Sequence, residues 1–160
     1  MATQRQATSA VRLRPGGVDD LDDVMRIMTS AFRPCFGEAW TRSQCAGIMP
    51  MHGVSLTIAD GDNGPIGFSL VRAVADEAEL LLLAVAPDEQ RRGIGQALLD
   101  DFIASALAEG THRLHLEVRD GNPAVELYRA SGFVVAGRRR NYYHGPDGEA
   151  FDAVTLLLAN

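Results

Sequence analysis

The segment that most constrains how this chain can fold is an apolar run followed by a glycine-containing turn and a long periodic stretch. Residues 80–86 contain no polar side chain, are too few for a helix of their own, and stop at Pro87. Such a run predicts a strand that is buried on both faces of a sheet. After the turn, apolar residues recur at helical spacing until Gly110, namely Leu98, Leu99, Phe102, Ile103, Ala106 and Leu107. The predicted order is strand, tight turn and helix.

The turn itself, residues 90–96 (Gln-Arg-Arg-Gly-Ile-Gly-Gln), suits an anionic ligand. The first amides of a helix have no partner within it, and the helix dipole adds partial positive charge at that end. Gly93 and Gly95 let a phosphate approach the backbone, and Arg91 and Arg92 add formal charge. The turn lacks the third glycine of the dinucleotide fingerprint and the Gly-Lys-Ser/Thr of the Walker loop. It predicts a pyrophosphate site of another kind, with an ordinary glycine-rich turn as the alternative.

The sequence around this turn resembles the GNAT acetyltransferases, whose glycine turn holds the pyrophosphate of acetyl-CoA. The similar motifs are Val-Ala-Pro at residues 85–87, the turn itself, Asn122, and Leu-Tyr-Arg-Ala-Ser-Gly-Phe at residues 127–133. Residues 116–119 (Leu-Glu-Val-Arg) and 139–143 (Arg-Arg-Asn-Tyr-Tyr) resemble the RimI group of that family. Enzymes of that group acetylate the N-terminal alanine of a small-subunit ribosomal protein. The resemblance runs from about Arg12 to the end of the chain.

The resemblance implies a GNAT fold of the α/β (α+β) class, with a mixed central sheet of about seven strands flanked by about four helices. The apolar patterns place the strands at residues 11–14, 54–59, 66–71, 80–86, 112–119, 133–138 and 152–158. They place helices at residues 18–32, after a capping box of Thr41 and Gln44, from the glycine turn to Gly110, and at 122–132. The N-terminal half of the sheet is expected to be antiparallel. The helix between strands 80–86 and 112–119 makes those two strands parallel neighbours, so the turn and Glu117 belong to one site.

Size and composition predict a single domain over residues 1–160, in which the polar residues 1–10 are flexible. No run of signal-peptide or membrane-span length is present, so we expect a cytoplasmic protein. Cys35 and Cys45 are expected to be packing residues, because a reducing compartment disfavours a disulfide. The formal charge of −6 argues against general nucleic-acid binding. It agrees with a cationic partner such as a basic peptide, although mild acidity is common in cytoplasmic proteins.

The resemblance assigns roles to individual residues. Glu117 would be the general base, acting through water, and Tyr128 would protonate the departing thiolate. The backbone of Leu83, Ala84 and Val85 would meet the acetyl and pantetheine end of acetyl-CoA. Amides of the turn would bind the pyrophosphate, and they belong to Arg91, Arg92, Gly93, Ile94, Gly95 and Gln96. The chemistry requires no metal.

Each catalytic assignment has a structural alternative. Glu117 could be an ion-pair partner of Arg113 or Arg119, since all three stand on the polar side of one strand. Tyr128 could be a core residue in the last turn of its helix.

Three binding assignments also leave alternatives open. Asn122 matches a CoA-contacting asparagine of the family but stands six residues before Tyr128, where the family has seven. Either the helix is one residue shorter or Gly121 takes its place, and a plain N-cap asparagine needs no ligand. Trp40 and Tyr142 could both line the substrate groove. Alternatively, Trp40 belongs to a loop that covers the core, and Tyr142 lies on a solvent-exposed edge.

The predicted function is transfer of acetyl from acetyl-CoA to the α-amino group of a protein or peptide N-terminus, such as that of a ribosomal protein. Neither nucleic acid nor membrane is expected as a partner, and both a monomer and a homodimer remain open. One alternative is a GNAT acetyltransferase of a small-molecule amine, such as an amino acid or an antibiotic. Another is a non-catalytic module that binds acyl-CoA or acts as a toxin antidote. The presence of both Glu117 and Tyr128 counts against the non-catalytic alternative.

Overall fold

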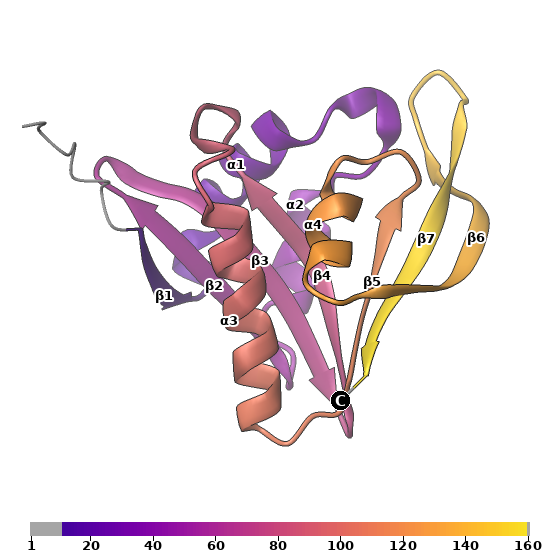
Figure 1. The fold of residues 1–160 in the computed structure, drawn as a ribbon. Coiled ribbons are helices and arrows are strands. Elements are labelled where there is room, and N and C mark those ends of the chain that lie inside the picture. Colours follow the sequence, from indigo (N-terminus) through magenta and orange to yellow (C-terminus); the bar gives the residue numbers. More distant parts are fainter. Residues whose placement is uncertain (1–10, 160) are drawn as a thin grey trace, which may run out of the picture.

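The computed structural model describes residues 11–159, which form one seven-stranded sheet with helices on both faces (Figure 1). The strands are β1 (Arg12–Gly16), β2 (Val54–Gly61), β3 (Gly64–Val74), β4 (Glu77–Val85), β5 (Arg113–Arg119), β6 (Val134–His144) and β7 (Ala150–Ala159). Their order in the sheet is β1-β2-β3-β4-β5-β7-β6, with β4 and β5 parallel and the other neighbours antiparallel. The predicted mixed sheet is confirmed. The predicted flexibility of residues 1–10 lies outside the described residues.

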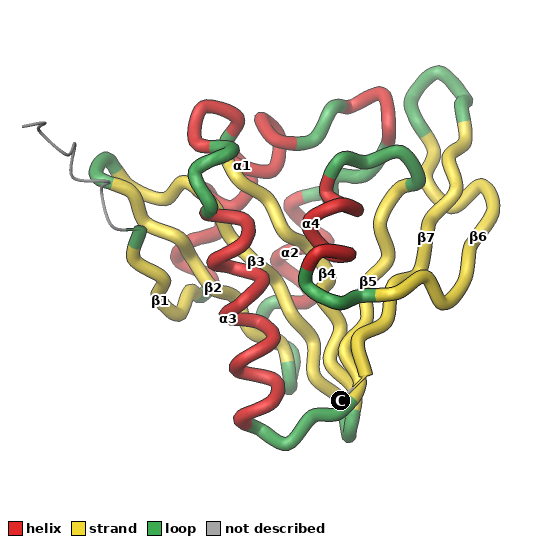
Figure 2. The backbone as a smooth tube through the Cα atoms, in the orientation of Figure 1, coloured by secondary structure: helices red, strands yellow, loops and turns green. Residues whose placement is uncertain are grey.

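Within the described residues four α-helices cover the sheet, two on each face (Figures 1 and 2). They are α1 (Leu21–Ala31), α2 (Arg42–Ile48), α3 (Ile94–Ala108) and α4 (Ala124–Ala130), and short 3-10 turns stand at η1 (Val18–Asp20), η2 (Pro34–Phe36) and η3 (Pro87–Glu89). The helix predicted from Val18 therefore begins at Leu21, after η1. The predicted capping box of α2 is present. The Gln44 amide donates to the Thr41 hydroxyl at 3.2 Å, and the Thr41 amide donates to the Gln44 side chain at 2.8 Å.

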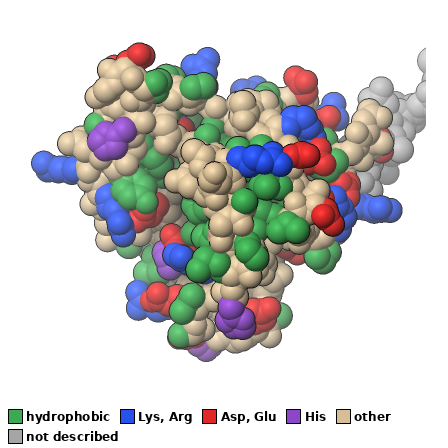
Figure 3. Space-filling model, turned by 180° about the vertical axis from the view of Figure 1, so that it is seen from behind, with side chains coloured by type: hydrophobic (Ala, Val, Ile, Leu, Met, Phe, Trp, Pro, Cys, Tyr) green, Lys and Arg blue, Asp and Glu red, His purple; other side chains and the backbone are tan. Residues whose placement is uncertain are grey.

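Each face of the sheet has its own core. Under α3 and α4 the buried side chains include Leu99, Phe102, Leu114, Leu116 and Phe133. Under α1 and α2 they include Ile27, Met28, Cys45, Ile58 and Phe68. Figure 3 shows the face that carries α1 and α2, where exposed hydrophobic side chains gather near the middle and charged side chains of both signs lie mostly around them.

Strand β4 contributes to both cores because it contains a bulge. The pairing with β3 shifts between Leu70 and Val71, so Leu81 has no partner on β3. One extra residue moves all later side chains of a strand to the opposite face. Side chains before the bulge therefore pack under α3 (Ala78, Leu80), and alternate side chains after it pack under α1 (Leu82, Ala84).

The prediction that β4 is buried on both faces is correct for only half of its residues. Leu81, Leu83 and Val85 are half-buried and line a cleft. The parallel ladder to β5 explains this, because it runs only from Glu77↔Arg113 to Leu80↔Leu116. Beyond that pair the second half of β4 has no partner strand on this side.

Two local predictions were wrong. The strand predicted over residues 133–138 does not end there but continues as β6 to His144, through register shifts after Val135 and Arg139, so the 139–143 run lies within it. These irregularities break the alternation of polar and apolar residues that marks a strand in the sequence. Cys35 is exposed in η2, because this segment lies at the surface, whereas Cys45 is buried as expected; both thiols are free.

Replacement of Leu98 by alanine should lower the free energy of unfolding by about 2–5 kcal/mol, because the side chain is fully buried between α3 and the sheet. Leu107→Ala on the same helix is the matched control, since this side chain is 44% exposed. Its effect should stay within about 0.5 kcal/mol. Urea unfolding of both variants measures the difference. Equal losses would contradict the packing described for α3.

Candidate active site

The gap between β4 and β5 opens into a cleft of about 1170 Å³. Its walls come from the second half of β4, the end of β5, the 90–96 turn, the start of α4, the end of β6 and the segment between α1 and α2. Of the residues assigned from the sequence, the cleft brings together Leu83, Ala84, Val85, Arg91, Gly93, Ile94, Gly95, Gln96, Glu117, Asn122, Tyr128, Trp40 and Tyr142. Arg92 is not among its lining residues.

At one end of the cleft the 90–96 turn has the geometry of an anion site. Arg91 and Gly93 both adopt left-handed conformations, with φ of 67° and 80°. Gly93 is the N-cap of α3, and no side chain caps this helix end. A Cβ atom at Gly93 would meet no heavy atom within 4 Å, so the space in front of the turn is open. Successive amides in such a turn form a concave group of donors that suits a phosphate.

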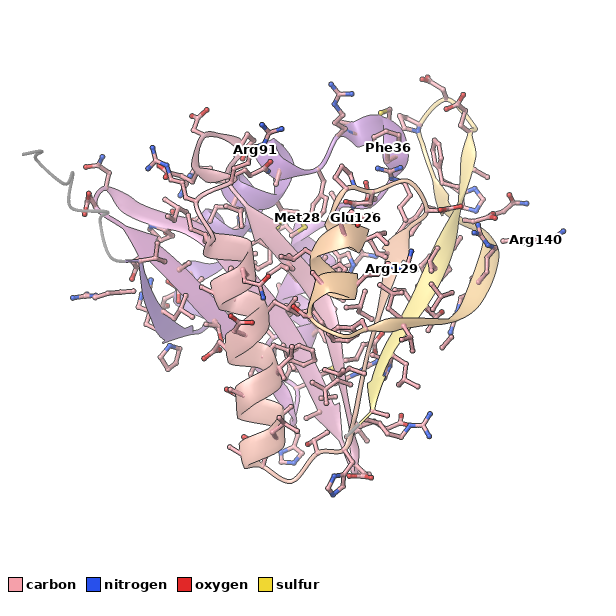
Figure 4. All side chains as sticks on the ribbon, in the orientation of Figure 1. Met28, Phe36, Arg91, Glu126, Arg129 and Arg140 are labelled. Carbon is pink, nitrogen blue, oxygen red and sulfur yellow. The ribbon has the colours of Figure 1, made fainter. Side chains whose placement is uncertain are left out.

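The two arginines of the turn are placed differently. Arg91 lies in the turn just before α3 and lines the cleft (Figure 4). Arg92 instead donates to the Glu89 carboxylate at 3.0 Å. The Ile94 side chain is buried in the core, so this residue can offer only its backbone to a ligand. Arg91 is thus the arginine of the turn that can add its charge to a bound anion.

The free edge of β4 provides backbone hydrogen-bonding groups. The Ala86 amide donates to the Ile66 carbonyl at 2.8 Å, and the partners of an antiparallel ladder alternate. Ala84 therefore bonds to β3, whereas the backbone groups of Leu83 and Val85 are directed to the cleft. Consistent with this direction, the Val85 carbonyl accepts a hydrogen bond from the Gln90 side chain at 3.0 Å.

Glu117 stands near the end of β5, and its side chain is only 14% exposed. Its carboxylate lies 2.6 Å from the Arg139 Nε. The partners considered from the sequence are engaged elsewhere, since Arg113 pairs with Glu77 and Arg119 with Glu38. A carboxylate at the wall of a cleft can accept a proton from a ligand once the cation beside it moves away.

Tyr128 is buried between α4 and the sheet, and its ring packs edge-on against Phe133 at 6.2 Å between centroids. Burial, together with the negative charge of Glu38, raises the pKa of Tyr128 well above its ordinary range. The phenol therefore keeps its proton at neutral and moderately alkaline pH. A protonated hydroxyl at the wall of the same cleft as Glu117 can act as a proton donor.

Glu38 is a buried charged residue of the cleft that sequence reasoning missed. It pairs with the Arg119 Nε at 3.0 Å, and both side chains are about 90% buried, with 8% and 10% exposed. Its other carboxylate oxygen accepts a hydrogen bond from the side-chain Nδ2 of Asn122 at 2.8 Å. The one signal in the sequence is an acid between two aromatic residues of a loop, Phe36 and Trp40.

Asn122 lies two residues before α4, and its side-chain oxygen accepts a hydrogen bond from the backbone amide of Ala124, the first residue of that helix, at 2.9 Å. Its side-chain nitrogen donates to Glu38. Both polar groups of this side chain therefore have partners within the protein. The predicted contact between Asn122 and CoA stays a prediction.

The η2 segment, which lines the cleft, lies against the β6–β7 hairpin. A Cβ atom at Gly37 would come within 2.1 Å of the His144 carbonyl oxygen, and one at Gly145 within 2.1 Å of the Cys35 carbonyl oxygen. Phe36 packs edge-on against Phe151, and the Arg119 guanidinium lies 3.7 Å from the centre of the Phe36 ring. Only glycine permits this backbone contact, which fixes two walls of the cleft relative to each other.

The two aromatic residues proposed for the substrate groove both line the cleft. Trp40 also packs against the core under α1, so it both lines the cleft and covers the core. Tyr142 is exposed on β6 and packs edge-on against Tyr143. Burial raises the pKa of Tyr143 well above its ordinary range, with Glu38 contributing.

Comparison of the sequence with known families places these features in context. Residues 21–133 match the acetyltransferase (GNAT) family. The chain belongs to this family. The family predicted from the glycine turn and the 127–133 motif is thereby confirmed.

Relatives of this GNAT chain include enzymes named [ribosomal protein bS18]-alanine N-acetyltransferase. The one from Escherichia coli K12 is 45% identical over 92 residues, which are 57% of this chain and 62% of the relative. The one from Haemophilus ducreyi is 39% identical over 106 residues, 66% of this chain and 72% of the relative. The chain thus spans less than two thirds of the Escherichia coli relative in the aligned region. The resemblance to the RimI group is confirmed as a similarity to proteins of that name.

Solved structures agree with this assignment. The crystal structure of the ribosomal-protein-S18-alanine N-acetyltransferase from Escherichia coli matches with a TM-score of 0.83 and 31% identity, covering 94% of each chain. That of Ard1 from Thermoplasma volcanium matches with a TM-score of 0.80 and 27% identity, covering 94% of this chain and 97% of the other. The fold of this GNAT domain is therefore shared over nearly the whole chain.

No group of three or more His, Cys, Asp or Glu side chains in residues 11–159 is arranged to hold a metal ion. None of the helices described here is long and apolar enough to cross a membrane. The expectation that the chemistry needs no metal stays a prediction.

Glu38→Gln or Arg119→Met should each destabilise the protein by about 3–5 kcal/mol, because either leaves a buried charge without its partner. The double variant should lose clearly less than the sum of the two single losses. The exposed Glu77–Arg113 pair is the control, and the same substitutions there should cost at most about 1 kcal/mol. Urea unfolding of each set gives the coupling energies. Strict additivity at Glu38 and Arg119 would show that the pair does not hold the η2 segment.

Proposed function

We propose that this protein transfers the acetyl group of acetyl-CoA to the α-amino group of a protein N-terminus, with the N-terminal alanine of a ribosomal protein as the acceptor. The observation that carries the proposal is that Glu117 and Tyr128 line one cleft, at the edge where β4 and β5 separate and beside a phosphate-type turn. Its support from relatives is that enzymes named for this reaction are 39–45% identical over the matched region.

The cleft has the groups that acetyl-CoA requires. Acetyl-CoA supplies an acetyl group activated as a thioester, carried on a pantetheine arm with a pyrophosphate. The amides of residues 93–96 and the Arg91 guanidinium would hold the pyrophosphate at the helix start. The free backbone edge at Leu83 and Val85 would hold the amide groups of the arm, as one strand holds another. The thioester would then lie between the ends of β4 and β5.

Acetyl transfer then needs one group to take a proton and one to give a proton. Glu117 would accept a proton from the acceptor ammonium, through water, which leaves a neutral amine. The amine nitrogen forms a bond to the acetyl carbon, and the bond from that carbon to sulfur breaks. Tyr128 would donate its proton to the departing sulfur, which a raised pKa allows throughout the neutral range. The nitrogen would release its second proton on becoming an amide, and that proton would return through water to the Tyr128 oxygen.

The chemistry favours an α-amine over a lysine side chain. An α-amino group has a pKa near 8, whereas that of a lysine side chain is about 10.4. A carboxylate therefore needs far less driving force to remove the proton from an N-terminus. An N-terminal alanine on a ribosomal protein also places the proposed reaction in the cytoplasm, where acetyl-CoA and ribosomes meet.

The direct test offers the protein acetyl-CoA and a peptide that begins with alanine and contains an internal lysine. We expect acetylation of the α-amine and none of the lysine, read by mass spectrometry. The enzyme contains no lysine, because all of its 15 Lys and Arg residues are arginine, so it adds no ε-acetyl background. Glu117→Gln should lose most of its rate at pH 7 and recover part of it at pH 9–10, where the amine is already neutral. Peptides starting with serine or methionine and free amines complete the panel.

Three results would contradict the proposal. Acetylation of lysine or of free amino acids and antibiotics in preference to the peptide N-terminus would favour the small-molecule or lysine alternatives. Tight CoA binding with no turnover on any amine would indicate a binding module. A Glu117→Gln loss that is the same at every pH would remove the base role.

Tyr128→Phe should lower kcat by about 100-fold or more, because it removes one acid while the ring packing is kept. Its unfolding free energy should change by no more than about 1 kcal/mol, since the ring contacts with Phe133 remain. The raised pKa predicts that the wild-type enzyme loses no acid catalysis up to about pH 10, the ordinary value for tyrosine. Steady-state kcat from pH 6 to 10 checks both points. A variant with wild-type kcat would leave Tyr128 as a core residue only.

A further inference from the structure

The carboxylate proposed as the base already holds a cation. The Arg139 Nε lies 2.6 Å from the Glu117 carboxylate, and the same guanidinium lies 5.6 Å from the centre of the Tyr142 ring. Burial, together with the adjacent Glu117 carboxylate, raises the pKa of Tyr142. The place beside Glu117 is therefore bounded by a carboxylate and an aromatic face, which together suit a positive charge.

The two partners of this ion pair are held very differently. Only 14% of the Glu117 side chain is exposed, whereas 62% of the Arg139 side chain is. Arg139 also stands on the outermost strand, β6, directly before the register shift at which β6 separates from β7. Among the described residues, Glu117 is the one carboxylate within ion-pair distance of Arg139. The guanidinium can therefore leave Glu117 by a rotation of an exposed side chain, giving up this ion pair and its contact with the Tyr142 ring.

We propose that the position of the Arg139 guanidinium beside Glu117 is the binding subsite for the ammonium group of the acceptor, and that Arg139 leaves it when the acceptor binds. This inference rests on the proposed function, because it names the amine subsite of the same cleft. It adds a role for Arg139, a residue of the 139–143 motif to which the sequence assigned none: Arg139 occupies the subsite in the free enzyme and sets how readily an acceptor enters.

The exchange is chemically reasonable because the two cations differ in one property. An α-amino group with a pKa near 8 is mostly an ammonium at neutral pH, so it can make the same contact as the guanidinium. A guanidinium does not release its proton in proteins, so Arg139 can hold the carboxylate but cannot react. The arriving ammonium can give its proton to Glu117 and become the nucleophile. Arg139 therefore occupies the place beside Glu117 until an acceptor is present.

Competition for one place has a measurable consequence. A binding-competent state that is only partly populated weakens the apparent affinity in proportion. Removal of the competing guanidinium should therefore tighten acceptor binding. The expected gain is about two- to fivefold, the scale of a partly exposed ion pair.

The experiment measures the Kd of an alanine-starting peptide for the CoA-bound protein and the KM of the same peptide. Arg139→Ala should lower both by about two- to fivefold and leave the affinity for CoA unchanged, which also shows that the variant is folded. Arg140→Ala is the matched control, because this substitution removes the same charge one residue further along β6. Its side chain points away from the molecule at the outer edge of β6 (Figure 4). This control should leave the peptide affinity unchanged.

A second measurement separates occupancy from a general effect of charge. Guanidinium ion at millimolar concentration should refill the empty subsite of Arg139→Ala and raise the peptide Kd toward the wild-type value. Potassium chloride at equal ionic strength should not. A peptide Kd that rises in Arg139→Ala, or a lower Kd that guanidinium does not reverse, would overturn the inference and make Arg139 a peptide contact or a bystander. A wild-type enzyme that acetylates no N-terminus would instead contradict the proposed function, while the binding data would still decide the subsite.

Discussion

The early end of the parallel ladder between β4 and β5 determines the rest of the site. After Leu80↔Leu116 the two strands no longer pair, and the backbone of β4 is left with donors and acceptors on one side. Buried backbone groups are normally paired, so such an edge persists only where water or a ligand can satisfy it. The bulge at Leu81 contributes, because it turns later side chains of β4 toward α1 and α2. Helix α4 then begins beside the opening and brings Tyr128 to it.

Electrostatics organise the opposite wall. The buried pair of Glu38 and Arg119 connects the segment before α2 to the end of β5, and Asn122 shares the same carboxylate. Burying two charges costs solvation, so this pair is better explained by the position it imposes than by stability. The negative charge of Glu38 also adds to the effect of burial in raising the pKa of Tyr128. One carboxylate thus joins two walls of the cleft and raises the pKa of the Tyr128 phenol, while a second, Glu117, lines the same cleft.

The sequence was sufficient for the local parts of this arrangement. The apolar run, the turn and the helix that follows are contiguous, and their chemistry follows from backbone geometry at a helix start, so Gly93 and Arg91 could be assigned directly. Glu117 could be placed because the parallel crossover fixes which strand ends share an edge. The partners of these residues could not, since Glu38 and Arg119 are 81 positions apart and Arg139 reaches Glu117 from an irregular edge strand. The exposure of Cys35 was missed for the same reason, because it follows from how η2 lies on the surface beside the hairpin.

The central claim is that the separated strands hold the thioester between Glu117 and Tyr128. A crystal structure with a bisubstrate compound, in which CoA is joined through an acetyl linker to a peptide starting with alanine, tests it most directly. The account predicts that the pyrophosphate lies on the amides of residues 93–96, the sulfur within hydrogen-bond reach of the Tyr128 hydroxyl, and the peptide nitrogen within one water of the Glu117 carboxylate, with Arg139 displaced. A compound bound with its sulfur away from Tyr128, or with its peptide on another face of the sheet, would contradict the account.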